Sequence, residues 1–177
     1  MGKQKSSREL ILRVTRGGVI AAIYATLTLV FAPFSFGAVQ FRISEALCIL
    51  PVFFPEAVLG LFVGCIVANI FSSNIVIADM IFGSLATLVA AMITRKLKSK
   101  WLVPLPSVVV NAVVVGLVIT FSMLSGANSG GGVFAKTYLI NMLEVGFGQL
   151  VVCYAGGIPL MMVLSRMKEK NVISMSL

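Results

Sequence analysis

Two charged residues, Arg42 and Glu45, lie inside a stretch that is otherwise apolar, and they are the first candidates for chemistry. Three residues apart on a helix, they would share one face, where they neutralise each other or hold a ligand between them. A charged side chain at the centre of a membrane helix costs about 2.5–3.5 kcal/mol. One interpretation is therefore an ion pair near the membrane interface. The other is a polar ligand site, because ionisable groups within a membrane are functional candidates by default.

Further polar residues are expected to join this pair in the outer half of the membrane. Asp79, Asn141 and Glu144 fall in the first turns of expected helices that enter from outside. Taken singly, each residue is also consistent with an interfacial side chain that reaches water. Asp79 fits this interpretation best. Their shared depth instead indicates one pocket, where carboxylates need a proton, a cation or hydrogen-bond donors. The expected substrate-binding residues are Gln40, Arg42, Glu45, Asp79, Asn111, Asn141 and Glu144, with Phe34 and Phe36 beside the ligand.

Three carboxylates, several amides and two aromatic rings suit a flat, donor-rich ligand that carries a positive charge. The edge of a guanine-like base offers adjacent N–H donors to one carboxylate, and its ring can stack on phenylalanine. An amine on the same ligand would meet a second carboxylate. The sequence therefore favours a ligand of this kind.

The elements that position these residues are expected to be membrane helices. Of the 177 residues, 59% are hydrophobic and only 11% are charged, whereas soluble domains are about 45–50% apolar and about 25% charged. The apolar stretches are continuous rather than alternating, and this pattern predicts transmembrane α-helices. The fold class is therefore an all-α membrane protein.

Basic residues set the expected topology. Of the 14 basic residues, 12 fall into three clusters, at 3–16, 95–100 and 166–170, and such clusters mark the cytoplasmic ends of membrane helices. Both termini are then cytoplasmic, and the net charge of +8 does not require a nucleic-acid partner. The chain is expected to form a single transmembrane domain over residues 1–177, with a basic tail at 1–15 and six spans at about 16–34, 39–53, 55–71, 77–94, 104–124 and 138–164.

The sequence gives no sign of an enzyme, a metal site or a cofactor held by this chain. It has no histidine, and its three cysteines (Cys48, Cys65 and Cys153) are isolated within apolar segments. Such spacing implies neither a disulfide nor a thiolate metal site. A phosphate-binding GxxxxGK[ST] loop is absent from the sequence, so the chain cannot hydrolyse ATP by that route.

Small residues spaced four apart indicate where helices approach each other closely. In the first span they form two pairs, Gly18 with Ala22 and Ala21 with Ala25. They favour either a contact with a partner protein or ordinary packing within the chain. A second strip lies in the third span, at Ala57, Gly60, Gly64 and Ala68.

The chain resembles the substrate-binding S components of energy-coupling factor (ECF) transporters and, more specifically, the QueT family of queuosine-precursor transporters. Four stretches carry the resemblance: Arg16–Tyr24, Gln40–Leu47, Gly60–Asn69 and Asp79–Gly83. The likeness extends over about residues 16–166. The second stretch is the specific one, because small-residue strips are common in the first helix of S components.

The resemblance implies a six-helix bundle in the plasma membrane of a prokaryote, with a ligand bound near the outer face. It implies a transmembrane T component and two cytoplasmic ATPases as partners, with ATP and magnesium bound by the ATPases. The T component would contact the first helix at Gly18, Ala21, Ala22 and Ala25. The implied substrate is a pre-queuosine base such as 7-aminomethyl-7-deazaguanine.

Three alternatives stay open. The first is an S component for another vitamin. The second is a self-sufficient ion-coupled carrier that uses Glu45 and Glu144 as relay groups, although the small size and the lack of an evident inverted repeat weigh against it. The third is a structural membrane subunit without a ligand.

Overall fold

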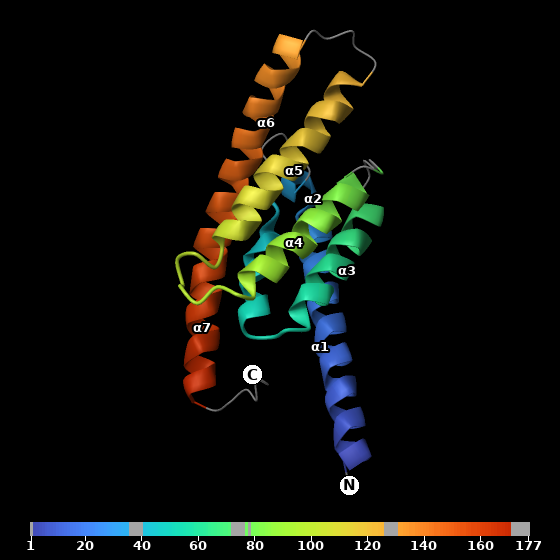
Figure 1. The fold of residues 1–177 in the computed structure, drawn as a ribbon, viewed down its shortest axis with the longest axis vertical. Helices are drawn as coiled ribbons and strands as arrows, with labels where there is room; N and C mark the ends of the chain where they lie inside the picture. Colours follow the sequence, from blue (N-terminus) through green and yellow to red (C-terminus); the bar gives the residue numbers. More distant parts are fainter. Residues whose placement is uncertain (1, 36–40, 72–76, 78, 126–130, 171–177) are drawn as a thin grey trace.

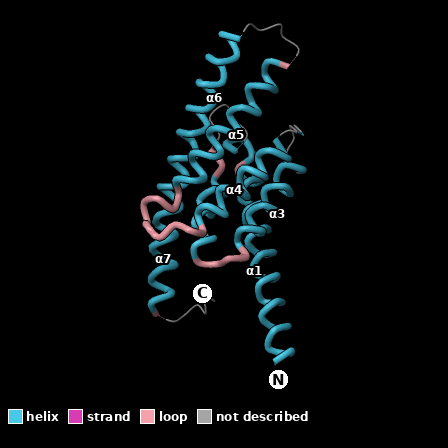
Figure 2. Tube along the Cα trace, in the orientation of Figure 1, coloured by secondary structure: helices cyan, strands magenta, loops and turns pink. Residues whose placement is uncertain are grey.

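The computed structural model describes residues 2–35, 41–71, 77, 79–125 and 131–170. Every regular element within these ranges is helical (Figure 2). In chain order the elements are α1 (Gly2–Val30), α2 (Ala32–Ser35), the 3-10 helix η1 (Ile43–Val52), α3 (Ala57–Ile70), the π-helical turn η2 (Asp79–Gly83), α4 (Ser84–Thr94), α5 (Leu105–Leu124), α6 (Gly131–Val152), the π-helical turn η3 (Cys153–Gly157) and α7 (Ile158–Glu169).

The helices form an elongated bundle whose two ends differ. Figure 1 shows the first turns of α1 and the last turns of α7 at one end, and the tops of α5 and α6 projecting together at the other. The most extensive packing joins α5 with α6 and α1 with α3. The basic ends of α1 and α7 therefore lie at the same end of the molecule, as the charge pattern predicts.

Three helical segments are long and apolar enough to cross a membrane: Ser7–Val30, Leu105–Leu124 and Gly131–Glu169. The other three apolar helices are shorter, at Ile43–Val52, Ala57–Ile70 and Met80–Thr94. The all-helical membrane class is thus confirmed. The count of six complete spans, with both termini on the cytoplasmic side, stays a prediction.

The second expected span, 39–53, is the segment that differs most from its prediction. It is a buried 3-10 helix of 10 residues, which at about 2.0 Å per residue extends only about 20 Å, short of the roughly 30 Å hydrocarbon core. Pro51 lies inside it and has no N–H to continue an α-helical ladder. Ile49 in its centre is 0% exposed, so the segment is enclosed by the other helices.

Helix α1 packs closely on α3 because glycines leave room for its backbone. A Cβ atom added at Gly60 would lie 2.7 Å from the Gly17 carbonyl oxygen, and one added at Gly64 would lie 2.8 Å from that of Ala21. The small-residue strip predicted in the third span is therefore a helix–helix contact. Its other members, Ala57 and Ala68, are also buried.

The first and last described segments are more helical than predicted. Helix α1 runs without interruption from Gly2 to Val30, so residues 2–15 of the predicted basic tail belong to it. The last helical segment begins at Gly131 rather than near residue 138 and continues through the η3 turn into α7. At this turn a Cβ on Gly156 would lie 2.8 Å from the Cβ of Ala46, so the glycine allows η1 to pack against η3.

Candidate functional site

Glu45 lies at the centre of a buried polar cluster built from several helices. Its side chain is 2% exposed. The Tyr24 hydroxyl, from α1, donates a hydrogen bond to Glu45 Oε1 at 2.5 Å, and the Asn111 side-chain amide, from α5, hydrogen-bonds the same carboxylate. Residues from three elements therefore meet at one carboxylate.

Arg42 lies just before η1, in an extended backbone conformation, and points toward α3. Its Nη2 atom donates to Asn69 Oδ1 at 3.4 Å, and its Nη1 atom donates to Cys65 Sγ at 3.6 Å. The charges of Arg42 and Glu45 interact electrostatically. Arg42 nevertheless hydrogen-bonds α3, whereas Glu45 hydrogen-bonds α1 and α5, so the two residues tie η1 to α3 on one side and to α1 and α5 on the other.

Two further contacts extend this cluster. The Thr87 hydroxyl of α4 donates to Cys65 Sγ at 3.7 Å, so α4 also contacts the group around Arg42. The hydroxyls of Thr28 and Ser44 are 2.6 Å apart, which adds a second link between α1 and η1. All of these side chains are buried.

Irregular helices surround the cluster. Thr87 also donates to the carbonyl of Gly83, the last residue of the η2 turn. The Cys153 thiol, at the start of the η3 turn, contacts the Glu45 carbonyl oxygen at 3.6 Å. Single π-helical turns within α-helices are frequent at functional sites. The η3 turn thus contacts the backbone of Glu45 in the 3-10 helix η1, and the η2 turn is linked through Thr87 to the group around Arg42.

Three buried polar atoms in and near this region have no hydrogen-bond partner among the described residues. They are Asn111 Oδ1, Ser35 Oγ and Ser84 Oγ, on side chains that are at most 2% exposed. Buried polar groups are nearly always partnered in folded proteins. An orphaned acceptor on Asn111, next to the Glu45 carboxylate, is therefore suited to a hydrogen-bond donor on a ligand.

The structure does not gather all the predicted site residues. Asn141 is buried, but its Nδ2 atom donates to Thr120 Oγ1 at 2.9 Å, and Thr120 lies nine residues beyond Asn111, or about 13 Å along α5. Glu144 is half-buried on α6, one turn from Asn141. Phe34 is 61% exposed.

The remaining predicted residues lie wholly or partly outside the described part of the chain. Asp79 begins the η2 turn, but its side chain lies outside the described part of the chain. Gln40 and Phe36 lie outside the described residues altogether.

The sequence does not single out several residues that the structure places beside Arg42 and Glu45. Tyr24, Thr28 and Ser44 are uncharged and occur in ordinary positions of apolar segments. The feature of the sequence that could have indicated them is their spacing. Tyr24 and Thr28 are four residues apart and so share one face of α1. That face contacts η1 only because of the tertiary packing.

The chain is similar in sequence to known transporters. The model of the QueT transporter family matches residues 14–166. A relative from Lactococcus lactis subsp. cremoris, described as "Queuosine precursor transporter QueT", is 36% identical over 73 residues, which are 40% of this chain and 42% of the relative. The match therefore spans less than half of that relative's length. No solved structure matches the chain. Because the family model covers most of the sequence, the chain belongs to the QueT transporter family, a family of transporters rather than enzymes.

Proposed function

We propose that the chain is the substrate-binding membrane subunit of an ECF-type ABC importer for a queuosine precursor base, 7-aminomethyl-7-deazaguanine or a close relative. Family membership and the name of the Lactococcus relative support this proposal. The structural observation that carries it is the buried Glu45 carboxylate beside Asn111, whose Oδ1 atom has no partner among the described residues.

The chemistry of this pair fits the edge of a deazaguanine. Each carboxylate oxygen has two lone pairs, so Glu45 can keep its hydrogen bonds to Tyr24 and Asn111 and still accept from adjacent ring and amino N–H groups. Asn111 Oδ1 would accept a further donor. A site that hydrogen-bonds a ligand in this way rejects analogues that lack the donor, because its own buried groups are then left unpaired.

The ligand's amine requires a second acceptor, which the proposal places on Glu144 or Asp79. Asn141, Gln40, Phe34 and Phe36 would complete the outer part of the site, with the phenylalanines beside the ring. Arg42, held by Asn69 and Cys65, would keep the start of η1, and hence Glu45, in position. The same arrangement leaves Arg42 within electrostatic reach of Glu45.

The proposed partners are a T component and two cytoplasmic ATPases, which would bind ATP and magnesium. On α1, Gly18 and Ala22 are exposed, whereas Ala25 is buried and Ala21 lies against Gly64 of α3. The proposal therefore assigns the direct contact with the T component to the side of α1 that carries Gly18 and Ala22. Ala21 and Ala25 would act by holding α1 in place.

The test is a calorimetric or thermal-shift titration of the purified chain with 7-aminomethyl-7-deazaguanine, guanine, riboflavin and thiamine. A ligand at 100 times its dissociation constant stabilises the protein by about 2.7 kcal/mol, so binding is readily visible. We expect stabilisation by the deazaguanine amine and its loss in Glu45→Gln. Glu169→Gln, which changes an exposed carboxylate, is the matched control and should bind normally.

Other results would support the alternatives. Binding of riboflavin or thiamine instead would keep the transporter subunit and change the substrate. Uptake by the purified chain alone in liposomes, driven by an ion gradient, would replace the ECF proposal with an ion-coupled carrier. If no ligand binds a folded sample and Glu45→Gln changes nothing, the chain would be a structural subunit.

A further inference from the structure

A groove separate from the Glu45 cluster runs between α1 and α3, at the end of the molecule that carries the basic first turns of α1. Its volume is about 570 Å³. Apolar and small side chains line it, among them Val14, Gly18, Leu59 and Val63. Arg13, from α1, and Arg95, which follows α4, also line it. The groove therefore combines an apolar floor with two guanidinium groups.

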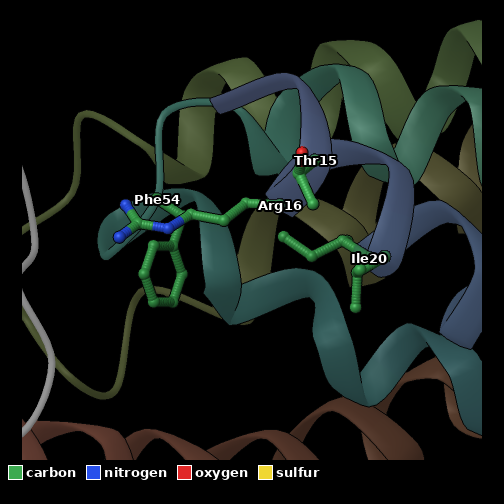
Figure 3. A pocket seen from close by; sticks show the side chains of 5 residues that line it. Thr15, Arg16, Ile20 and Phe54 are labelled. Carbon is green, nitrogen blue, oxygen red and sulfur yellow. The ribbon is translucent and has the colours of Figure 1, made fainter. Parts of the chain in front are cut away.

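Among the described residues that line this groove, Glu56 is the one carboxylate, and it forms an ion pair with Arg16. Glu56 Oε1 lies 3.5 Å from Arg16 Nη1, and the Glu56 side chain is 8% exposed. The Arg16 guanidinium also lies over the ring of Phe54, 5.7 Å from its centroid, as Figure 3 shows in the adjacent small pocket. Pairing Arg16 with Glu56 leaves Arg13 and Arg95 as an excess of two positive charges at the groove.

We propose that this groove binds an anionic phospholipid, with the headgroup phosphate between Arg13 and Arg95 and an acyl chain along the apolar floor. The inference rests on the membrane location of the chain and does not depend on the proposed substrate. Because Gly18 is also assigned to the T-component contact, lipid and T component would occupy this part of the groove in turn. The planar guanidinium group binds phosphate oxygens through two parallel hydrogen bonds. Basic pockets between membrane helices are binding sites for anionic headgroups.

The dimensions of the groove suit a lipid. Arg13 and Ala21, which both line it, are eight residues apart, or about 12 Å along α1. The acyl chain would follow this length from the charged end toward the bilayer centre. A Cβ at Gly18 would meet nothing within 4 Å, so the groove is open at this residue. In a bilayer, acyl chains surround any apolar groove, and the arginines therefore decide which lipid is bound.

The experiment uses the purified full chain in detergent, titrated with dioleoyl phosphatidylglycerol or dioleoyl phosphatidylcholine. Native mass spectrometry measures the bound lipid, and a thermal shift measures the stabilisation. We expect phosphatidylglycerol to bind at least tenfold more tightly. In the double variant Arg13→Gln/Arg95→Gln its affinity should fall by about 30-fold, since each basic residue near an anionic surface contributes about fivefold.

Two further variants separate this site from general electrostatics. Arg8→Gln/Lys98→Gln removes two exposed charges that do not line the groove and should change the affinity less than threefold. Gly18→Leu fills the groove without changing its charge and should weaken both lipids. If the double arginine variant does not fold, the single variants Arg13→Gln and Arg95→Gln, each expected to lose about fivefold, decide the role of the arginines.

Several outcomes would overturn the proposal. Equal binding of the two lipids would show that the arginines do not select the headgroup. An equal loss of phosphatidylglycerol affinity in Arg8→Gln/Lys98→Gln would show that only the net charge matters. Equal stabilisation by glycerophosphoglycerol, which has no acyl chains, would show that the apolar floor of the groove does not contribute to binding. A dimer in the mass spectrum that Gly18→Leu abolishes would make the groove a protein interface instead.

Discussion

At the scale of single residues, the buried carboxylate of Glu45 depends on partners that come from other helices. Tyr24 donates to it from α1, and Asn111 contacts it from α5. A carboxylate taken out of water loses its hydration, and hydrogen bonds must replace that hydration within the protein. The loss of one hydrogen-bond donor to Glu45 therefore lowers the free energy of unfolding more than the loss of a donor at an exposed position.

The first prediction concerns this donor. Tyr24→Phe removes the hydroxyl from a side chain that is 1% exposed and should lower the free energy of unfolding by about 1–3 kcal/mol. Tyr138→Phe is the matched control, because its hydroxyl donates to the Val113 carbonyl at 3.3 Å in an exposed position, and it should cost under about 1 kcal/mol. Denaturant unfolding in detergent measures both, and equal losses would contradict the role given to Tyr24.

At the scale of elements, glycines determine how closely the helices approach. Gly60 and Gly64 set the distance between α1 and α3, and Gly156 sets that between η3 and η1. Within a membrane, where lipid is as apolar as leucine, close packing of small residues is a main source of helix association. The position of Tyr24 against Glu45 follows from these contacts.

The second prediction tests the contact between α1 and α3. A Cβ at Gly64 would lie 2.9 Å from the Tyr24 Cβ and 2.8 Å from a backbone oxygen, so Gly64→Ala must displace α1. We expect a loss of about 1–3 kcal/mol of stability. Gly18→Ala, which adds the same methyl group in open space, should have little effect. If both variants unfold at the same denaturant concentration, the packing argument fails.

The third prediction links the η3 turn to the site. Gly156→Ala would place its Cβ 2.8 Å from that of Ala46, the neighbour of Glu45 in η1, and should shift the carboxylate. We expect about a tenfold loss of ligand affinity, since a cost of about 1.4 kcal/mol is one order of magnitude. Gly132→Ala, where a Cβ meets nothing within 4 Å, is the control. Unchanged affinity in Gly156→Ala would show that η1 does not depend on this contact.

At the scale of the whole molecule, the distribution of charge predicts how the bundle sits in the membrane. The basic turns of α1 and α7 lie at the same end (Figure 1). Positive clusters stay on the cytoplasmic side. The opposite end, where α5 and α6 project, would then face outward.

The fourth prediction tests this orientation. The three native cysteines are buried, so the unsubstituted chain should react little with a membrane-impermeant thiol reagent. Ser125→Cys, directly after α5, should be labelled in intact cells. Ser99→Cys, within the basic cluster at 95–100, should be labelled only after the cells are permeabilised. Both serines are exposed, and therefore accessibility within the protein does not differ between them. The reverse pattern of labelling would invert the topology.

Composition and charge alone determined the class of the protein and singled out Arg42 and Glu45, which the structure buries between several helices. Exposing a continuous apolar stretch to water is unfavourable in free energy, and so is placing a charge in lipid. Apolar stretches and charges can therefore be interpreted without knowing any tertiary contact. The same reasoning locates the helix-packing strip of the third span. It also gives the boundaries of α5 to within about a residue.

Only the tertiary structure decided which groups surround Glu45. Tyr24 lies 21 residues before it and Cys153 lies 108 residues after it, and no local pattern fixes such distant contacts. They depend on the close approach that Gly60, Gly64 and Gly156 permit. The tertiary structure also separated Asn141 from the cluster and made η1 a short buried helix, because depth along a helix does not determine which neighbour a side chain meets.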